Sequence, residues 1–365
     1  MSRRAFLASM AASGAALGLG LGRGGRALAQ QASGMSHPLW PLWDVWRSAN
    51  LEFSGRVIDR PQGNASHSEG QGYGMLLAAE IGDGDAFRRM ADWTDANLAI
   101  RADSLLAWRW QPDVPGRVAD PNNASDGDLF YAWALVRGAE RFGEPRWSRR
   151  ATEIAMDLAA KCIAVRPDRP GTPILLPAEY GFVSETGVTV NPSYMMPRAM
   201  REVAQATGVP QLAEAARSGL ELMAQIASVQ LVPDWLAITP SGIRPDERFS
   251  FQMGYEALRI PLFLAWSGER GHPALRRAAA AMADAAARLP AAQHATVIDA
   301  RTGTVLESSA DPGYAAITGL VDCAVNGGFG APIPGFSPEQ PYYPATLHMF
   351  ALLSQTEQYP SCLPI

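Results

Sequence analysis

The sequence predicts an all-α protein in which two layers of helices close into a double ring. Three observations lead to this fold class. About eleven or twelve segments with helical spacing follow one another at even intervals, and few stretches alternate as strands do. Strongly apolar segments alternate with amphipathic ones, as expected for an inner layer and a solvent-facing outer layer. No Ser/Pro-rich stretch marks a linker, and a two-domain helical protein is the alternative.

The first 29 residues are similar to an export signal. The motif SRRAFL at residues 2–7 resembles a twin-arginine signal, an apolar Ala/Gly-rich run follows, and ALA at residues 27–29 matches a small-x-small cleavage site. We therefore expect residues 1–29 to be a twin-arginine-type signal peptide and residues 30–365 to form one domain. The mature protein is then periplasmic or secreted.

Composition argues against several classes of function. Cleavage after residue 29 removes four arginines and no acidic residue, so the formal net charge moves from −5 to −9, which suits neither nucleic acid nor an anionic membrane surface. The three cysteines allow at most one disulfide and include no CxxC pair, and the five histidines include no HExxH motif. We therefore expect no nucleic-acid partner, no membrane insertion, no metal and no cofactor.

The helical segments can be placed from their spacing and from the turn residues between them. The first is the Trp-rich segment 39–51, whose tryptophans at every third residue indicate a helix face packed in a core. Further helices are expected over residues 74–82, 83–98, 128–142, 149–165, 194–207, 210–227, 254–266, 273–289, 314–325 and 346–358. Residues 296–298 and 304–306 are expected to form a small hairpin, and Tyr342 and Tyr343 to help close the ring.

The motif SEGQGYGM at residues 68–75 is the centre of the predicted site. It places the carboxylate of Glu69 among three glycines, directly before an apolar run. Because glycine carries no side chain, we expect a large ligand to approach the backbone closely here, beside the ring and hydroxyl of Tyr73. The alternative is a glycine-rich turn in which Glu69 only caps the following helix.

Two further carboxylates stand at the start of apolar helices. Asp126 lies in NNASDGD at residues 122–128 and is also a suitable N-cap, although Ser125 and Asp128 can share that role. Glu256 lies in GYEALR at residues 254–259. Arg259 follows three residues later, close enough on a helix for a structural ion pair to be the alternative to a functional role.

Aromatic residues in the loops accompany these carboxylates. Trp108, Arg109 and Trp110 form an extended segment with both rings on one side, Tyr194 follows Asn-Pro-Ser, and Tyr255 precedes Glu256. Because the inner helices of a ring present their N-terminal ends on one side, we expect these loops to converge on one groove. Carboxylates in an aromatic groove suit glycoside hydrolysis, which needs a proton donor for the glycosidic oxygen and a second carboxylate.

At these motifs the chain resembles glycoside hydrolase family 8, particularly the bacterial endoglucanases associated with cellulose-producing operons. The matching blocks are SEGQGYGM at 68–75, WRW at 108–110, ASDGD at 124–128, NPSY at 191–194 and GYEALR at 254–259, which together span most of the mature chain. The resemblance implies a single (α/α)6 barrel of six inner and six outer helices. It also implies that residues 30–365 are a catalytic domain with an open groove for a β-1,4-linked glucan.

The resemblance further implies an exported endo-β-1,4-glucanase, or cellulase, that hydrolyses internal bonds with inversion and works near a cellulose synthase complex. Glu69 would be the general acid, Asp126 would bind the sugar at the cleavage point, and Glu256 would be the base. The implied substrate-binding residues are Tyr73, Trp108, Arg109, Trp110, Tyr194, Tyr255 and Arg259.

One position departs from the family pattern, because the endoglucanase branch has aspartate where this chain has Glu256. The extra methylene moves the carboxylate by about 1 Å, and a displacement of that size can cost roughly a hundredfold in rate. We interpret Glu256 as a tolerated variant. The alternatives are a chitosanase or xylanase on the same barrel, or a catalytically weakened glucan-binding protein that aids cellulose export.

Overall fold

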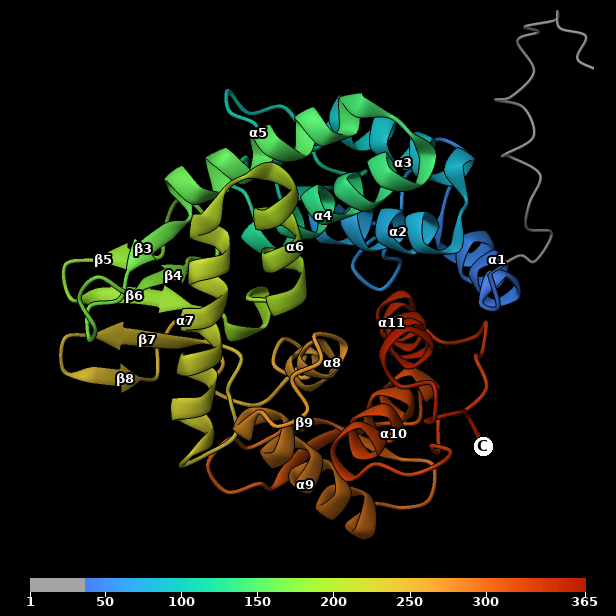
Figure 1. Cartoon of the computed structure of the whole chain (residues 1–365), viewed down its shortest axis with the longest axis vertical. Coiled ribbons are helices and arrows are strands. Elements are labelled where there is room, and N and C mark those ends of the chain that lie inside the picture. Colours follow the sequence, from blue (N-terminus) through green and yellow to red (C-terminus); the bar gives the residue numbers. More distant parts are fainter. Residues whose placement is uncertain (1–36) are drawn as a thin grey trace, which may run out of the picture. The chain divides into compact units, whose positions relative to one another are not determined.

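The computed structural model describes residues 37–365, so the predicted signal peptide lies outside the described residues. This part of the chain contains eleven α-helices, drawn in Figure 1. They are α1 (Trp40–Asn50), α2 (Ser68–Ile81), α3 (Gly84–Asn97), α4 (Ser125–Phe142), α5 (Pro145–Lys161), α6 (Pro197–Thr207), α7 (Pro210–Ala227), α8 (Arg259–Trp266), α9 (Pro273–Arg288), α10 (Pro312–Asn326) and α11 (Tyr342–Gln358).

The helices form two layers, and the predicted (α/α)6 barrel is confirmed. Helices α2, α4, α8, α10 and α11 are buried along most of their length, and α6, which packs between α4 and α8 inside α7, completes the inner layer (Figure 1). Helices α1, α3, α5, α7 and α9 each bury one face and form the outer layer. Residues 327–341 contain no helix, so the sixth outer position is irregular.

The last inner helix closes the ring against the first elements. Helix α11 packs against both α1 and α2, and the indole Nε1 of Trp46 donates to Thr346 Oγ1 at 3.0 Å. Trp43 and Trp46 are fully buried and stack on one another, as the core interpretation of the Trp-rich segment requires.

The strands are more numerous than the sequence predicts. Strands β9 (His294–Ile298) and β10 (Val305–Ser309) form the predicted hairpin. Three further antiparallel sheets join β1 (Ser66–His67) to β2 (Arg109–Trp110), β3 (Ile163–Val165) to β4 (Pro173–Leu175), and β5 (Val183–Ser184), β6 (Gly187–Val190), β7 (Leu236–Thr239) and β8 (Gly242–Arg244) to one another. These unpredicted strands span only two to four residues, too few for strand alternation to stand out in the sequence.

Several helix boundaries differ from the prediction, and three of these differences change how the site or a neighbouring strand is built. Helix α2 begins at Ser68 rather than after Gly74, so Glu69 and the three glycines lie inside the helix. Helix α8 begins only at Arg259, so Glu256 lies in the turn before it. The helix predicted over residues 149–165 ends at Lys161, because the residues after it pair as β3.

The glycines of α2 make room for neighbouring helices. A Cβ atom at Gly72 would lie 2.8 Å from the backbone nitrogen of Tyr131 in α4, and one at Gly74 would lie 2.9 Å from the sulfur of Met90. The expectation that these glycines open the backbone to a ligand is therefore wrong. Gly127 of α4 makes the reciprocal approach, since its Cβ would lie 2.1 Å from Ser68 Oγ. The N-terminal ends of α2 and α4 are thus held together.

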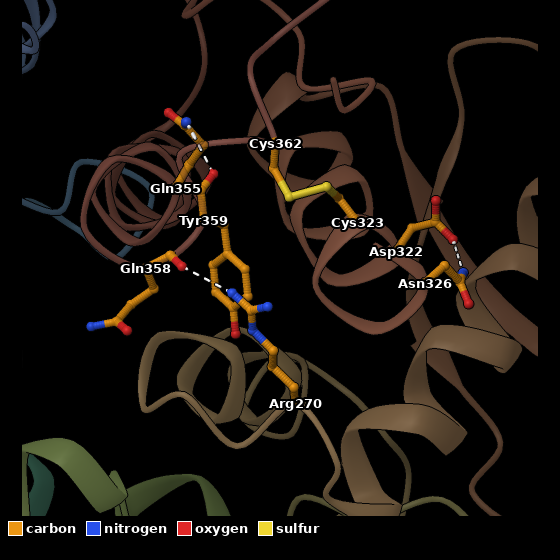
Figure 2. Close-up of a disulfide and its surroundings, with 8 residues drawn as sticks. All are labelled: Arg270, Asp322, Cys323, Asn326, Gln355, Gln358, Tyr359 and Cys362. Atoms are coloured by element: carbon orange, nitrogen blue, oxygen red, sulfur yellow. Dashed lines mark hydrogen bonds between the residues drawn. A yellow bond between two sulfur atoms is a disulfide. The ribbon is translucent and has the colours of Figure 1, made fainter. Parts of the chain in front are cut away.

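The cysteines form one disulfide, Cys323–Cys362, and leave Cys162 as a buried free thiol. Figure 2 shows the disulfide joining α10 to the segment after α11. In that segment the Tyr359 hydroxyl donates to the carbonyl of Ala265 in α8 at 2.7 Å. The C-terminal segment is therefore tied to both α8 and α10. Among residues 37–365, no helix combines the length and apolarity needed to cross a membrane.

Candidate active site

A groove of about 590 Å³ opens where the inner helices begin. Its lining includes residues at or just before the first turns of all six inner helices, as the sequence predicts. These residues are Glu69 (α2), Asp126 (α4), Tyr194 (α6), Arg259 (α8), Asp311 (α10) and Tyr342 (α11). Helix N-termini carry partial positive charge and stabilise nearby anions. The groove is therefore suited to hold carboxylates.

One guanidinium connects the three predicted carboxylates. The Arg259 side chain is 2% exposed. Its Nη1 forms ion pairs with Glu69 and, at 3.5 Å, with Asp126 Oδ2, and its Nη2 pairs with Glu256. The Glu69 and Asp126 partners lie 190 and 133 residues away in sequence, so the fold assembles this cluster. The ion pair between Glu256 and Arg259 expected from their spacing is present.

Two hydroxyl groups also accept hydrogen bonds from the Arg259 guanidinium. Nη1 donates to the Tyr73 hydroxyl at 3.0 Å, and Nη2 donates to Ser193 Oγ at 2.8 Å. Tyr73 is 1% exposed and packs edge-on against Phe130. Its hydroxyl therefore supports Arg259 from beneath the groove, and its ring is covered.

Three carboxylates share a single cation in this cluster, which favours retention of a proton. Burial and then the negative charge of Glu69 raise the pKa of Asp126 well above its usual range, against the opposing effect of Arg259. Desolvation also raises the pKa of Glu256, although Arg259 acts in the opposite direction. The raised pKa of Asp126 favours a proton on its carboxyl, which lies close to Glu69 and the groove.

Glu256 is the most open of the three carboxylates, with its side chain 35% exposed, against 22% for Glu69 and 3% for Asp126. Its turn is fixed from below by Asp234, whose Oδ1 accepts from the backbone nitrogens of Gly254 at 2.9 Å and Ala257 at 2.7 Å. The carboxylate is oriented from the side, because Asn191 Nδ2 donates to its Oε2 at 3.2 Å. Glu256 is therefore both accessible and held in place.

The predicted aromatic residues divide into two groups. Trp108, Tyr194 and Tyr255 line the groove. Trp110 packs edge-on against Trp93, with ring centroids 5.8 Å apart, and does not line the groove. The expectation that Trp108 and Trp110 share one side of the segment is therefore wrong, because Trp108 lies before β2 begins and its ring turns towards His67. Arg109 likewise lies outside the groove lining, and its guanidinium sits over the Trp108 ring.

Tyr342 and Tyr343, for which the sequence predicts a structural role, both line the groove. The Tyr343 hydroxyl donates to the carbonyl of Tyr255, beside Glu256. Other lining residues that the sequence did not single out include Asp59, Gln62, Asp311 and Tyr314. The sequence feature that could have identified Tyr342 as a groove residue is its place at the start of a buried helix, which it shares with Glu69.

Several buried polar atoms of the groove lack a hydrogen-bond partner within the described part of the chain. They are His67 Nε2, Ser68 Oγ and the Tyr342 hydroxyl. Burying polar atoms without partners costs free energy, and these three atoms lie just beneath the surface of the groove. Over residues 37–365, no group of three His, Cys, Asp or Glu side chains is placed to hold a metal ion.

Comparison with known proteins agrees with this geometry. The family model of glycosyl hydrolases family 8 matches residues 26–357. This chain belongs to glycoside hydrolase family 8. The family resemblance inferred from the sequence motifs is thus confirmed.

Among similar proteins, a probable endoglucanase of Novacetimonas hansenii is 32% identical over 334 residues, which cover 87% of this chain and 90% of the relative. An endoglucanase of Cellulomonas uda is 32% identical over 227 residues, which cover 61% of this chain and 62% of the relative. Among solved structures, a family 8 endoglucanase of Klebsiella pneumoniae has a TM-score of 0.78 at 29% identity, over 87% of this chain and 99% of that one.

Proposed function

We propose that this family 8 protein is an endo-β-1,4-glucanase that hydrolyses internal bonds of cellulose or a related glucan with inversion. The observation that carries the proposal is the cluster of Glu69, Asp126 and Glu256 around Arg259, at the floor of an aromatic-lined groove. The relatives described as endoglucanases support the same substrate class.

In the proposed reaction Glu69 gives its proton to the glycosidic oxygen as the bond to the anomeric carbon breaks. A water molecule attacks that carbon from the opposite face and loses a proton to Glu256. The products are one chain with a new reducing end in the α-configuration and one with a free 4-hydroxyl group. Asp126 binds the sugar at the cleavage point and exchanges a proton with Glu69.

The predicted domain division and export route belong to this proposal. Residues 1–29 would direct twin-arginine-type export, and residues 30–365 would act as the catalytic domain in the periplasm or outside the cell. A site of action beside a cellulose synthase complex would place the enzyme where newly made glucan emerges.

Chitosan is a second candidate substrate, favoured by the charge of the groove. Five carboxylates line it, on Asp59, Glu69, Asp126, Glu256 and Asp311, and Arg259 is its one lining guanidinium among the described residues. Burial raises the pKa of Asp59, and the neighbouring His67 acts in the opposite direction. A surplus of negative charge attracts a chain of protonated glucosamine units.

Hexasaccharides of glucose, glucosamine and xylose, digested in parallel by the mature protein, distinguish these substrates. We expect the glucose hexamer to be cleaved at internal bonds, giving products of two to four units, roughly tenfold or more faster than the others. Product lengths are read by chromatography, with a protein-free digestion as the control. Cleavage of the glucosamine or xylose hexamer alone would overturn the proposed glucanase activity, while the protein would still be a glycoside hydrolase.

A further inference from the structure

Asp128 lies two residues after Asp126 on α4, is fully buried and does not line the groove. Both of its carboxylate oxygens accept hydrogen bonds from other parts of the chain. Oδ1 accepts from the backbone nitrogen of Leu106 at 2.7 Å, and Oδ2 accepts from Asn123 Nδ2 at 2.9 Å. Asp128 therefore joins α4 to two loops that contain little regular structure.

Asn123 extends this link to a third loop. Its Oδ1 accepts from the backbone nitrogen of Glu179 at 2.8 Å, and its Nδ2 also lies 3.3 Å from Cys162 Sγ. The orientation of the Asn123 amide is thereby fixed, because its oxygen must face an N–H group and its amino group must face Asp128. The pair Asp128–Asn123 is thus a buried junction between α4 and three loops.

Trp108 is carried by the loops that this junction holds. Its backbone nitrogen donates to the carbonyl of Asn122 at 2.9 Å, its indole Nε1 donates to Asp120 Oδ2 at 3.1 Å, and its carbonyl accepts from the backbone nitrogen of Ser68 at 3.0 Å. Leu106, two residues before Trp108, is itself hydrogen-bonded to Asp128. Asn122, which bonds to the Trp108 backbone, directly precedes Asn123 of the junction. The Trp108 ring then forms a wall of the groove beside His67.

We propose that Asp128 and Asn123 are positioning residues that set the distance between Trp108 and the carboxylates of Glu69 and Asp126. Because Asp126 and Asp128 share the first turn of one helix, the sugar platform and the cleavage point are tied to the same rigid element. A glucan unit stacked on Trp108 is then held at a fixed distance from the bond to be cut. This inference rests on the proposed function, since it assumes a sugar at Trp108.

Exchanging the two side chains tests the junction. In Asp128→Asn the new side chain has one oxygen and one amino group, whereas both of its neighbours, Asn123 Nδ2 and the Leu106 N–H, are donors. In either orientation the amino group faces a donor, so one hydrogen bond is lost. In the double variant Asp128→Asn/Asn123→Asp the bond between the two side chains is restored with donor and acceptor reversed. The backbone N–H groups of Leu106 and Glu179 still donate to a side-chain oxygen, and the net charge is unchanged. We expect kcat/KM on cellohexaose to fall about 10- to 100-fold in the single variant and to recover to within about threefold of wild type in the double variant.

A second comparison separates positioning of Trp108 from general loosening of the protein. In a Trp108→Ala background, we expect Asp128→Asn to change kcat/KM by less than about twofold, because the platform it positions is gone. The proposal would be overturned if Asp128→Asn lowered kcat/KM equally with and without Trp108. It would also be overturned if the exchanged double variant had the melting temperature of wild type but did not recover kcat/KM.

Amide hydrogen exchange gives a readout that does not require activity. We expect residues 105–110 to exchange faster in Asp128→Asn and at the wild-type rate in the exchanged variant. Unchanged exchange in Asp128→Asn would overturn the junction itself, even in a protein that cleaves no glucan. Absence of glucan cleavage by the wild-type protein would instead contradict the proposed function.

Discussion

Replacing Glu69 with glutamine is expected to remove hydrolysis while leaving glucan binding in place. Glutamine matches glutamate in shape and retains an oxygen for Arg259, but it has no acidic proton to give to the glycosidic oxygen. A positioned general acid contributes about 10²- to 10⁴-fold to a rate, so kcat on cellohexaose is expected to fall by that factor. The measurement is reducing-sugar release beside calorimetric binding of the same oligosaccharide.

A matched control for this variant is Glu140→Gln, on α4 but 66% exposed and outside the groove. It removes the same charge and should keep full activity. Comparison of wild type with Glu69→Gln distinguishes an enzyme from a glucan-binding protein. A binding protein would hydrolyse no glucan in its wild-type form and would bind glucan equally well after the substitution. Retention of more than a tenth of wild-type kcat by Glu69→Gln would contradict the role of Glu69 as general acid.

The second large effect concerns stability and follows from Arg259→Met. The arginine is buried among three carboxylates, and breaking a buried ion pair by removing one partner typically costs about 3–5 kcal/mol of the free energy of unfolding. Without the cation, the pKa of Asp126 and the pKa of Glu256 should rise further. A carboxyl with a raised folded-state pKa contributes stability at low pH and loses it as the pH rises.

The loss in Arg259→Met is therefore expected to be largest near pH 8 and to shrink towards pH 5, as the carboxyls take up protons. Urea unfolding of wild type and variant at the two pH values measures it. Arg88→Met is the control, because Arg88 pairs with the exposed Asp85 and should change stability by at most about 1 kcal/mol. A loss that is equal at both pH values would contradict the electrostatic origin of the effect.

Local patterns in the sequence were sufficient to predict a double ring of helices and a groove that brings carboxylates together. Helical periodicity persists over ten or more residues in most of these helices, and Glu69 and Asp126 stand directly before apolar runs. The convergence of the helix N-termini followed from the alternation of inner and outer helices. Arg259 was predicted as a partner of Glu256, three residues away.

What could not be predicted depends on contacts between distant segments. Pairing of β6 with β7 joins Val190 to Leu236, and nothing local in either strand identifies its partner. Whether an aromatic residue faces the groove or the core also depends on its neighbours. Tyr73 faces Phe130 and Trp110 faces Trp93, whereas Tyr343 reaches the groove. The glycines of α2 are explained only once α4 lies against them.

Proton NMR of cellohexaose during digestion is the most direct test of the proposed inverting mechanism, with Glu256→Ala digested alongside. Inversion by a water molecule activated at Glu256 predicts that the α-anomer of the new reducing end appears first in the wild-type digestion, and that its formation is slowed at least about a hundredfold in the variant. Early appearance of the β-anomer, or an undiminished rate in Glu256→Ala, would contradict the mechanism.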